Sequence, residues 1–245
     1  MKRAAAYFAL ADWFEYLNSD CDYEKWSQYL HGELLSLGID TGTGLDIGCG
    51  SGYFTRAFSR RGYRMTGFDI SERMLSKAQA LSDAEGVRAQ FVLCDILRLK
   101  TFERADFALC INDCINYVPQ DKLLQAFKKV AASLKKGGAF IFDVSSEYKL
   151  REIVGNNTFC EDRDDVAYLW FNKLFGDRVE MDFTLFARRN DGAFERGDER
   201  HVQYIHGERH ICECLESAGF ELLKTAGGLG DPKDRQRVNF IGIRK

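Results

Sequence analysis

A glycine-rich turn near residue 50 joins a short apolar run to an amphipathic segment. Three glycines at alternate positions follow the apolar run 44–47: Gly48, Gly50 and Gly52. Glycines let a ligand approach the backbone closely, because they carry no Cβ. The helix expected after the turn would add free N–H groups from its first residues. The pattern predicts a nucleoside-cofactor site at the first strand of a doubly wound α/β sheet.

Two acidic residues indicate which cofactor this turn favours. Asp46 precedes the first glycine by two residues, where a carboxylate would repel a pyrophosphate and attract a cationic ligand. S-adenosylmethionine (SAM) carries a sulfonium and an ammonium, and it has no phosphate. Asp69 ends the next apolar run, about 20 residues downstream, where an acid commonly meets ribose hydroxyls. Because the glycines also depart from G-x-G-x-x-G, SAM is favoured over a nicotinamide dinucleotide.

Further segments make the chain resemble the class I SAM-dependent methyltransferases over most of its length. These segments are 69–75 (Asp-Ile-Ser-Glu-Arg-Met-Leu), 92–97 (Val-Leu-Cys-Asp-Ile-Leu), 105–113, the glycine pair 137–138 with the strand after it, 219–222 and 238–243. The resemblance implies a Rossmann-like, doubly wound, seven-stranded α/β sheet. It also implies SAM as the cofactor and S-adenosylhomocysteine as the product.

The resemblance also implies which residues hold SAM. The backbone at Gly48, Cys49, Gly50 and Gly52 would meet the methionyl and ribose parts. Asp46 would offset the cationic end, and Asp69 would hold the ribose hydroxyls. The other expected cofactor contacts are Ile70, Met74, Asp95 and Ile96 around the adenine, Asn112 near the methyl group, and an aromatic lid of Tyr7, Tyr23 and Trp26.

Two features limit the resemblance to one subgroup of these enzymes: the aromatic-rich segment 7–26 and the motif Asp113-x-x-Asn116-Tyr117. They are similar to segments of amino-sugar N,N-dimethyltransferases and glycine N-methyltransferase-like enzymes. That subgroup implies a small-molecule acceptor, with contacts from Asn116, Tyr117, Trp170, Tyr204 and His206. Asp113 after the fourth strand and His201 on the insertion are the candidate catalytic residues, and an amine that binds deprotonated would need no base. Tyr204 and His206 stand where the subgroup has Arg and Tyr. The identity of the acceptor is therefore not inherited, and transfer to nitrogen or to oxygen stays open.

Changes in the periodicity of apolar residues divide the chain into four parts. Residues 1–42 are expected to form a helical lid, 43–145 the SAM-binding core, and 209–245 a helix with the closing strand hairpin. Between them, 146–208 alternates apolar and polar residues with a period of two, which predicts an antiparallel β insertion that covers the acceptor. In it Glu199, His201 and Gln203 share one face of a strand.

Composition excludes several classes of protein. The 245 residues carry a net charge of −3, and no run of Lys or Arg exceeds two, so nucleic acid is disfavoured as a partner. No apolar run reaches membrane-spanning length. The eight cysteines lack paired C-x-x-C spacing, so we expect no metal and reduced thiols in a cytoplasmic protein. A monomer or a homodimer fits equally. The alternatives to a small-molecule enzyme are an RNA or protein methyltransferase and a non-catalytic SAM-binding module.

Overall fold

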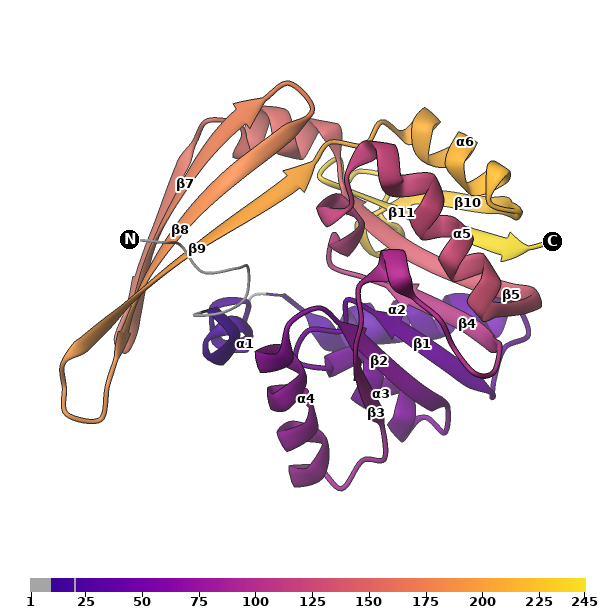
Figure 1. The fold of residues 1–245 in the computed structure, drawn as a ribbon, viewed down its shortest axis with the longest axis horizontal. Helices are drawn as coiled ribbons and strands as arrows, with labels where there is room; N and C mark the ends of the chain where they lie inside the picture. Colours follow the sequence, from indigo (N-terminus) through magenta and orange to yellow (C-terminus); the bar gives the residue numbers. More distant parts are fainter. Residues whose placement is uncertain (1–9, 20) are drawn as a thin grey trace.

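The computed structural model describes residues 10–19 and 21–245 (Figure 1). One sheet has seven strands, and a second sheet of four strands stands beside it. The strands of the large sheet are β1 (Thr43–Ile47), β2 (Arg64–Asp69), β3 (Gln90–Leu93), β4 (Ala105–Cys110), β5 (Leu134–Ser145), β10 (Phe220–Gly227) and β11 (Arg237–Arg244). The helices are α1 (Phe14–Leu17), α2 (Tyr23–Ser36), α3 (Tyr53–Arg60), α4 (Glu72–Ala84), α5 (Leu123–Ser133) and α6 (Glu208–Ser217).

The large sheet has the order β10-β11-β5-β4-β1-β2-β3. The strands from β5 to β3 pair in parallel, and β11 runs antiparallel to both of its neighbours. The order reverses between β1 and β4, and ligands of such sheets bind at this switch point, beyond the carboxyl ends of the strands. The predicted Rossmann-like α/β class is confirmed, as is the antiparallel insertion after the fifth strand.

Each face of the large sheet carries its own apolar core, because successive side chains of a strand point to opposite faces. On β5, Phe140 and Phe142 join the cluster formed with α5 and α6, whereas Ala139 and Ile141 join the cluster formed with α2 and α3. Burying each such large side chain contributes about 1.5–3 kcal/mol. This double packing holds the carboxyl ends of the strands in fixed positions.

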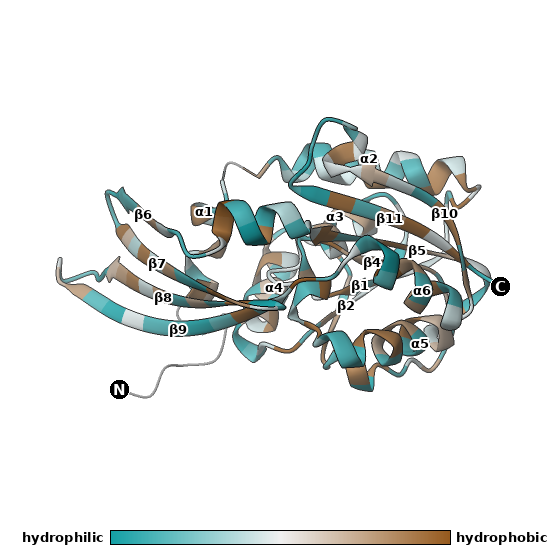
Figure 2. Ribbon diagram, turned by 90° about the horizontal axis from the view of Figure 1, so that it is seen from above, coloured by the Kyte–Doolittle hydropathy of each residue, from teal (hydrophilic) through white to brown (hydrophobic). Residues whose placement is uncertain are grey.

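The insertion forms an antiparallel meander in the order β6-β7-β8-β9. Its strands are β6 (Thr158–Arg163), β7 (Val166–Phe175), β8 (Arg178–Arg188) and β9 (Phe194–Tyr204), and a single turn of π-helix, η5 (Lys149–Val154), precedes them. The long β9 is mostly hydrophilic in Figure 2. On β8 the side chains alternate strictly between buried and half-buried from Val179 to Leu185. The inner face of this sheet is therefore apolar along β8 and polar along β9.

The amino-terminal segment bridges the two sheets. The short 3-10 helix η1 (Leu10–Asp12) and α1 lie between the insertion and the core (Figure 1). Arg163 on β6 donates to the carbonyls of Tyr16 and Leu17, and Lys77 on α4 donates to the carbonyl of Asp12 over 2.9 Å. These contacts place the segment beside the carboxyl edge of the large sheet.

All eight cysteines are free thiols. Across residues 10–19 and 21–245, no helix combines the length and the apolar character needed to cross a membrane.

Candidate active site

The glycine turn takes a backbone shape that requires glycine. Gly48, Gly50 and Gly52 have φ values of 71°, 53° and 80°, in the left-handed region that L side chains avoid. A Cβ at Gly48 would lie 2.2 Å from the Cys114 sulfur, and one at Gly52 would lie 2.7 Å from the Phe91 ring. Cys49 is buried. The turn leaves room for a ligand against the backbone and none for side chains.

Asp69 lies at the end of β2 beside this turn. Its two carboxylate oxygens accept from the backbone N–H groups of Gly50, over 2.9 Å, and Ser71, over 2.8 Å. Burial raises the pKa of this carboxyl. The arrangement fits a ribose, because an oxygen that accepts one N–H keeps a second lone pair for a ligand hydroxyl.

Asp46 lies beneath the turn, where it is 2% exposed. The hydroxyl of Thr55 on α3 donates to it over 2.5 Å. Burial raises the pKa of Asp46 to about 6. The carboxylate therefore supplies a negative charge below the turn, and its side chain is enclosed by the protein.

The predicted adenine end contains one exposed apolar residue and one backbone cap. Ile70 is 71% exposed, which gives a ring a surface on which to pack. Asp95 accepts from the N–H of Leu97 over 2.8 Å and so caps the 3-10 helix η2 (Ile96–Arg98). Met74, by contrast, is 2% exposed and packs under the turn. A Cβ added at Gly50 would lie 3.3 Å from its terminal methyl group. It supports the turn from below and does not line a surface.

Asn112 and Asp113 follow β4 with φ values of 62° and 50°. Left-handed conformations at residues other than glycine cost about 1–3 kcal/mol each and gather at functional sites. The phenol of Tyr23 on α2 lies within hydrogen-bonding reach of Asn112, and burial raises its pKa. This turn and the glycine turn stand at the ends of the adjacent strands β4 and β1.

A buried ionic cluster holds Asp113. Gln203 on β9 donates to one of its oxygens over 2.5 Å, and Arg237 on β11 reaches the other over 3.3 Å. Arg237 also pairs with Asp143, at the end of β5. Burial tends to raise the pKa of Asp113, but the charges of Arg237 and Lys149 outweigh burial and hold it below its usual value. A carboxylate so stabilised is a poor proton acceptor, so its environment argues against the expected catalytic role.

The ring of Trp26, expected to cover the methionyl part of SAM, packs against an arginine of the protein itself. The guanidinium carbon of Arg237 lies 5.6 Å from the centre of the Trp26 ring. The ring thus supports the arginine of the ionic cluster, and no contact of Trp26 with a ligand is needed to explain its burial. Tyr7, the other end of the expected aromatic lid, lies outside the described residues.

A second buried chain of polar groups links β9 to the core. The hydroxyl of Tyr117 lies 2.9 Å from Nδ1 of His201, and Nε2 of His201 lies 3.0 Å from a carboxylate oxygen of Glu199. The other oxygen of Glu199 accepts from the N–H of Leu10. Sequence reasoning placed Glu199 and His201 on one face, but it did not join them to Tyr117.

Comparison with known proteins identifies the family. Residues 45–138 match the family described as a methyltransferase domain. A putative methyltransferase of Geobacillus sp. (strain WCH70) is 29% identical over 242 residues, which cover 96% of this chain and 98% of that protein. The crystal structure of a SAM-dependent methyltransferase from Clostridium acetobutylicum ATCC 824 matches 95% of this chain and 96% of its own, with 29% identity and a TM-score of 0.88. The chain is a SAM-dependent methyltransferase with the fold of the class I enzymes.

The likeness in fold extends to a more distant structure. Streptomyces venezuelae DesVI matches 99% of this methyltransferase and 100% of its own chain, with a TM-score of 0.80 and 17% identity. At that identity the likeness concerns the fold alone. Because it spans the whole of both chains, the insertion belongs to the fold that the two proteins share.

Three of the expected acceptor residues are engaged in holding the methyltransferase together. Asn116 is fully buried and bonds the backbone of Ser145 and the carbonyl of Tyr204. The side chain of Tyr204 lies on the opposite face of β9 from His201, because their positions differ by an odd number. His206 is 2% exposed, its Nε2 lies 3.1 Å from the carbonyl of Val118, and burial lowers its pKa to about 4. These environments fit structural roles better than contact with an acceptor.

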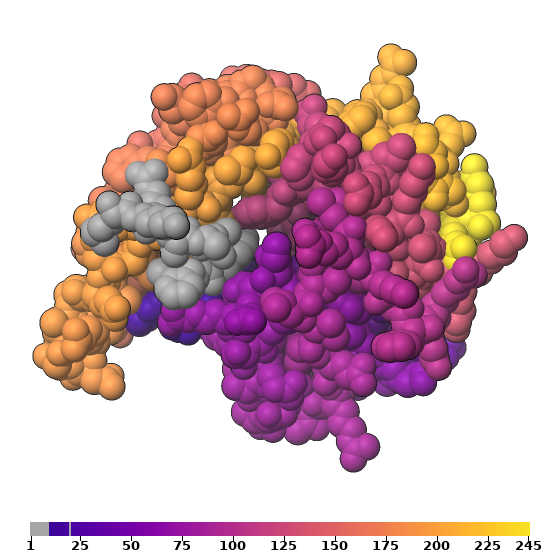
Figure 3. All heavy atoms as spheres, viewed as in Figure 1, coloured from indigo at the N-terminus to yellow at the C-terminus, as the bar shows by residue number. Residues whose placement is uncertain are grey.

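Trp170 on β7 packs within the insertion. It contacts both apolar clusters of that sheet, and its ring centre lies 5.4 Å from that of Phe159. Figure 3 shows the surface of the methyltransferase hollowed between the orange strands of the insertion and the magenta core. The expected acceptor space is thus bounded by the insertion on one side and by the ends of β4 and β5 on the other.

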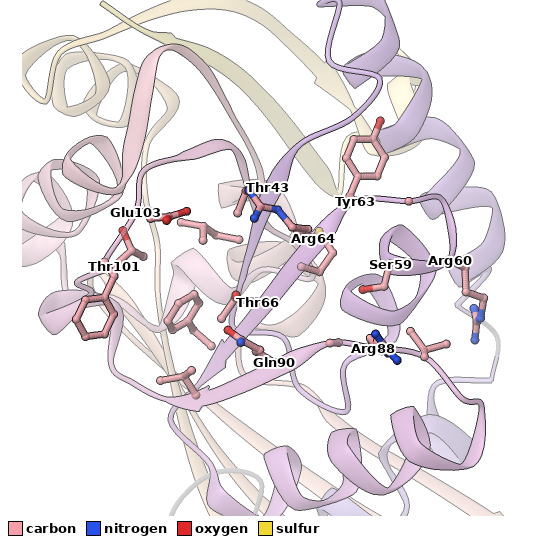
Figure 4. Close-up of a pocket in the computed structure, with 18 of the residues that line it drawn as sticks. Thr43, Ser59, Arg60, Tyr63, Arg64, Thr66, Arg88, Gln90, Thr101 and Glu103 are labelled. Carbon is pink, nitrogen blue, oxygen red and sulfur yellow. The ribbon is translucent and has the colours of Figure 1, made fainter.

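A groove of about 1010 Å³ lies elsewhere (Figure 4). Its walls include the first residues of three strands, Thr43, Arg64 and Gln90, and the last residue of α3, Arg60. Because β1, β2 and β3 are parallel, these residues mark the end of the sheet opposite to the glycine turn. The groove is therefore separate from the cofactor site.

Proposed function

We propose that this methyltransferase moves the methyl group of SAM to a nitrogen or an oxygen of a small polar molecule. The observation that carries the proposal is the link from Gln203 on the insertion to Asp113 at the carboxyl edge of the sheet. It turns the polar face of β9 toward the edge where ligands of such sheets bind. A polar acceptor would lie between these two surfaces.

The residues present fit SAM. The glycine turn offers backbone without Cβ atoms, Asp69 offers acceptors for ribose hydroxyls, and Asp46 offers negative charge beneath the turn. Bound SAM would supply an electrophilic methyl group, and the protein would orient the acceptor and exclude water. Glu15 in α1 accepts from the hydroxyl of Ser51 in the glycine turn over 2.6 Å. The amino-terminal segment therefore closes the methionyl end of the expected cofactor site.

A screen for SAM turnover tests this proposal. The purified protein would be incubated with SAM and sets of amines, amino sugars and phenolic acids, and S-adenosylhomocysteine would be measured by mass spectrometry. We expect turnover with members of one set, and much less with the Asp69→Ala variant when the SAM concentration is held near the wild-type Kd. Turnover with RNA or peptides alone would instead assign a macromolecular acceptor. SAM binding without turnover on any acceptor would assign a non-catalytic binding module.

A further inference from the structure

The chain of hydrogen bonds from Glu199 through His201 to Tyr117 joins three separate parts of the structure. Glu199 and His201 belong to β9, Tyr117 ends the 3-10 helix η3 (Cys114–Tyr117), and Leu10 in η1 donates to Glu199. Glu199 is fully buried, His201 is 7% exposed, and Tyr117 is half-buried. The polar atoms thus run from a fully buried carboxylate to a half-buried tyrosine.

One assignment of the hydrogens in this chain follows when Glu199 is ionised. An ionised carboxylate only accepts, so Nε2 of His201 carries the hydrogen that faces Glu199. In the neutral ring Nδ1 then has a lone pair, and the hydroxyl of Tyr117 donates to it. This order of donors and acceptors can carry a proton from Tyr117 to His201, with the charge of the resulting imidazolium balanced by Glu199.

We propose that Tyr117, supported by His201 and Glu199, takes the proton that the acceptor loses on methylation; this rests on the proposed function. As the new bond forms between the acceptor atom and the methyl carbon, the carbon–sulfur bond of SAM breaks and its electron pair stays on sulfur. The acceptor's proton passes to the oxygen of Tyr117, and the hydroxyl proton of Tyr117 passes to Nδ1 of His201. Release of that proton to water after product departure restores the starting state.

Other ionisable groups near this edge are less suited to the task. Asp113 is paired with Arg237, which keeps its carboxylate ionised and weakly basic. His206 is enclosed and bonded to the carbonyl of Val118. Tyr117 follows the strained Asn112–Asp113 turn within the same short segment. Its hydroxyl bonds His201, and Gln203 on the same face of β9 bonds Asp113, so the relay lies beside the ionic cluster at the carboxyl edge.

The proposal defines the chemistry of the acceptor. A group that needs this relay carries a proton to lose, such as a phenolic or alcoholic hydroxyl, or an ammonium, which must give up its proton before the nitrogen lone pair can attack. An amine that binds without its extra proton would attack with no base. Tyr117 would be the catalytic residue, and His201 and Glu199 would be positioning residues that act through it.

Kinetics on variants gives the first half of the test, with an acceptor from the turnover screen. Tyr117→Phe should lower kcat by about 10²–10⁴-fold, the usual contribution of a general base, and should leave the Kd for SAM within about twofold. Glu199→Gln should lower kcat at an unchanged Kd for SAM. Tyr148→Phe, at a tyrosine 40% exposed, is the matched control and should match wild type. A kcat of Tyr117→Phe within threefold of wild type would overturn the relay while leaving the proposed function intact.

Nuclear magnetic resonance gives the second half and needs no acceptor. The protein has four histidines, so His201→Gln assigns the ring nitrogens of His201 in ¹⁵N-labelled protein bound to S-adenosylhomocysteine. We expect a protonated Nε2, an unprotonated Nδ1, and a shift of the Nδ1 signal in Tyr117→Phe. A protonated Nδ1 in wild type would overturn the relay whatever the kinetics show. Failure of wild type to methylate any small molecule, despite binding SAM, would refute the proposed function and the relay together.

Discussion

The side-chain amide of Gln203 donates to Asp113 over 2.5 Å, and so joins the insertion to the end of β4. The same carboxylate is paired with Arg237 from β11, which also pairs with Asp143 from β5. Three strands of the core and one strand of the insertion therefore meet at one buried ionic cluster. The position of the insertion relative to the large sheet depends on it.

Arg237→Met should destabilise the protein by about 3–5 kcal/mol, because it leaves the buried carboxylate of Asp143 and the partly buried carboxylate of Asp113 without their counter-charge. Urea denaturation followed by circular dichroism measures the free energy of unfolding. Arg209→Ala is the matched control, since Arg209 forms an exposed pair with Glu213 at 2.8 Å, and such pairs contribute about 0–1 kcal/mol. Equal effects of the two variants would show that the cluster does not hold the fold.

Gly48→Ala should cost more stability than Gly38→Ala, although the two glycines have similar φ values of 71° and 74°. Both substitutions hold an alanine in the left-handed region, which costs about 1–2 kcal/mol. Only at Gly48 does the added methyl meet another side chain, 2.2 Å from the Cys114 sulfur, and such overpacking costs about 1–3 kcal/mol more. Thermal unfolding of the two variants compares them directly. Equal losses would mean that the glycine turn is looser than described.

Asp46→Asn should flatten the dependence of stability on pH between about 4 and 6. The pKa of Asp46 rises from 3.8 to about 6 on folding, so in this window the folded state binds more protons than the unfolded state. Its contribution to stability is present below pH 4 and falls as pH rises to 6, by about 3 kcal/mol at most. The variant should therefore be more stable than wild type at pH 7.5.

Urea denaturation at pH 4, 5, 6 and 7.5 checks this expectation for Asp46. Asp121→Asn, at an exposed carboxylate, serves as the control and should keep the wild-type slope. Parallel pH profiles for wild type and Asp46→Asn would show that the buried carboxyl does not titrate in this range.

The sequence predicted that the residues expected to hold the cofactor lie together, because they are local to the motif. Asp46, the glycines and Asp69 lie at the ends of two adjacent parallel strands, so their closeness follows from the strand pattern alone. The face shared by Glu199, His201 and Gln203 also followed, from the two-residue period of β9. The same alternation places the side chain of Tyr204 on the other face of β9, away from these three residues.

The rest of the site depends on contacts between distant segments. Arg237 reaches Asp143 across 94 positions, and nothing near either residue in the sequence marks the pair. Asn116 and His206 were expected to bind the acceptor because they stand in segments that resemble the subgroup, but their partners here are backbone groups of other segments. Residue type alone does not distinguish a polar group that binds a ligand from one that secures a loop.

Asp69→Ala should weaken SAM binding by about 1.5–3 kcal/mol, as for the loss of hydrogen bonds to a charged group. Asp95→Ala should cost less, because the adenine would keep its apolar contact with Ile70. Isothermal calorimetry gives both affinities, with circular dichroism to confirm that each variant is folded. Unfolding of Asp69→Ala would instead show that this acid mainly secures the N–H groups of Gly50 and Ser71.

Calorimetric titration of the wild-type protein with SAM, S-adenosylhomocysteine and NAD tests the cofactor site most directly. The enclosed charge of Asp46 beneath the glycine turn, with Asp69 at its rim, favours a cationic ligand without phosphate. We expect micromolar Kd values for SAM and S-adenosylhomocysteine, corresponding to about −8 kcal/mol, and no heat of binding with NAD. Tighter binding of NAD than of SAM would contradict the account.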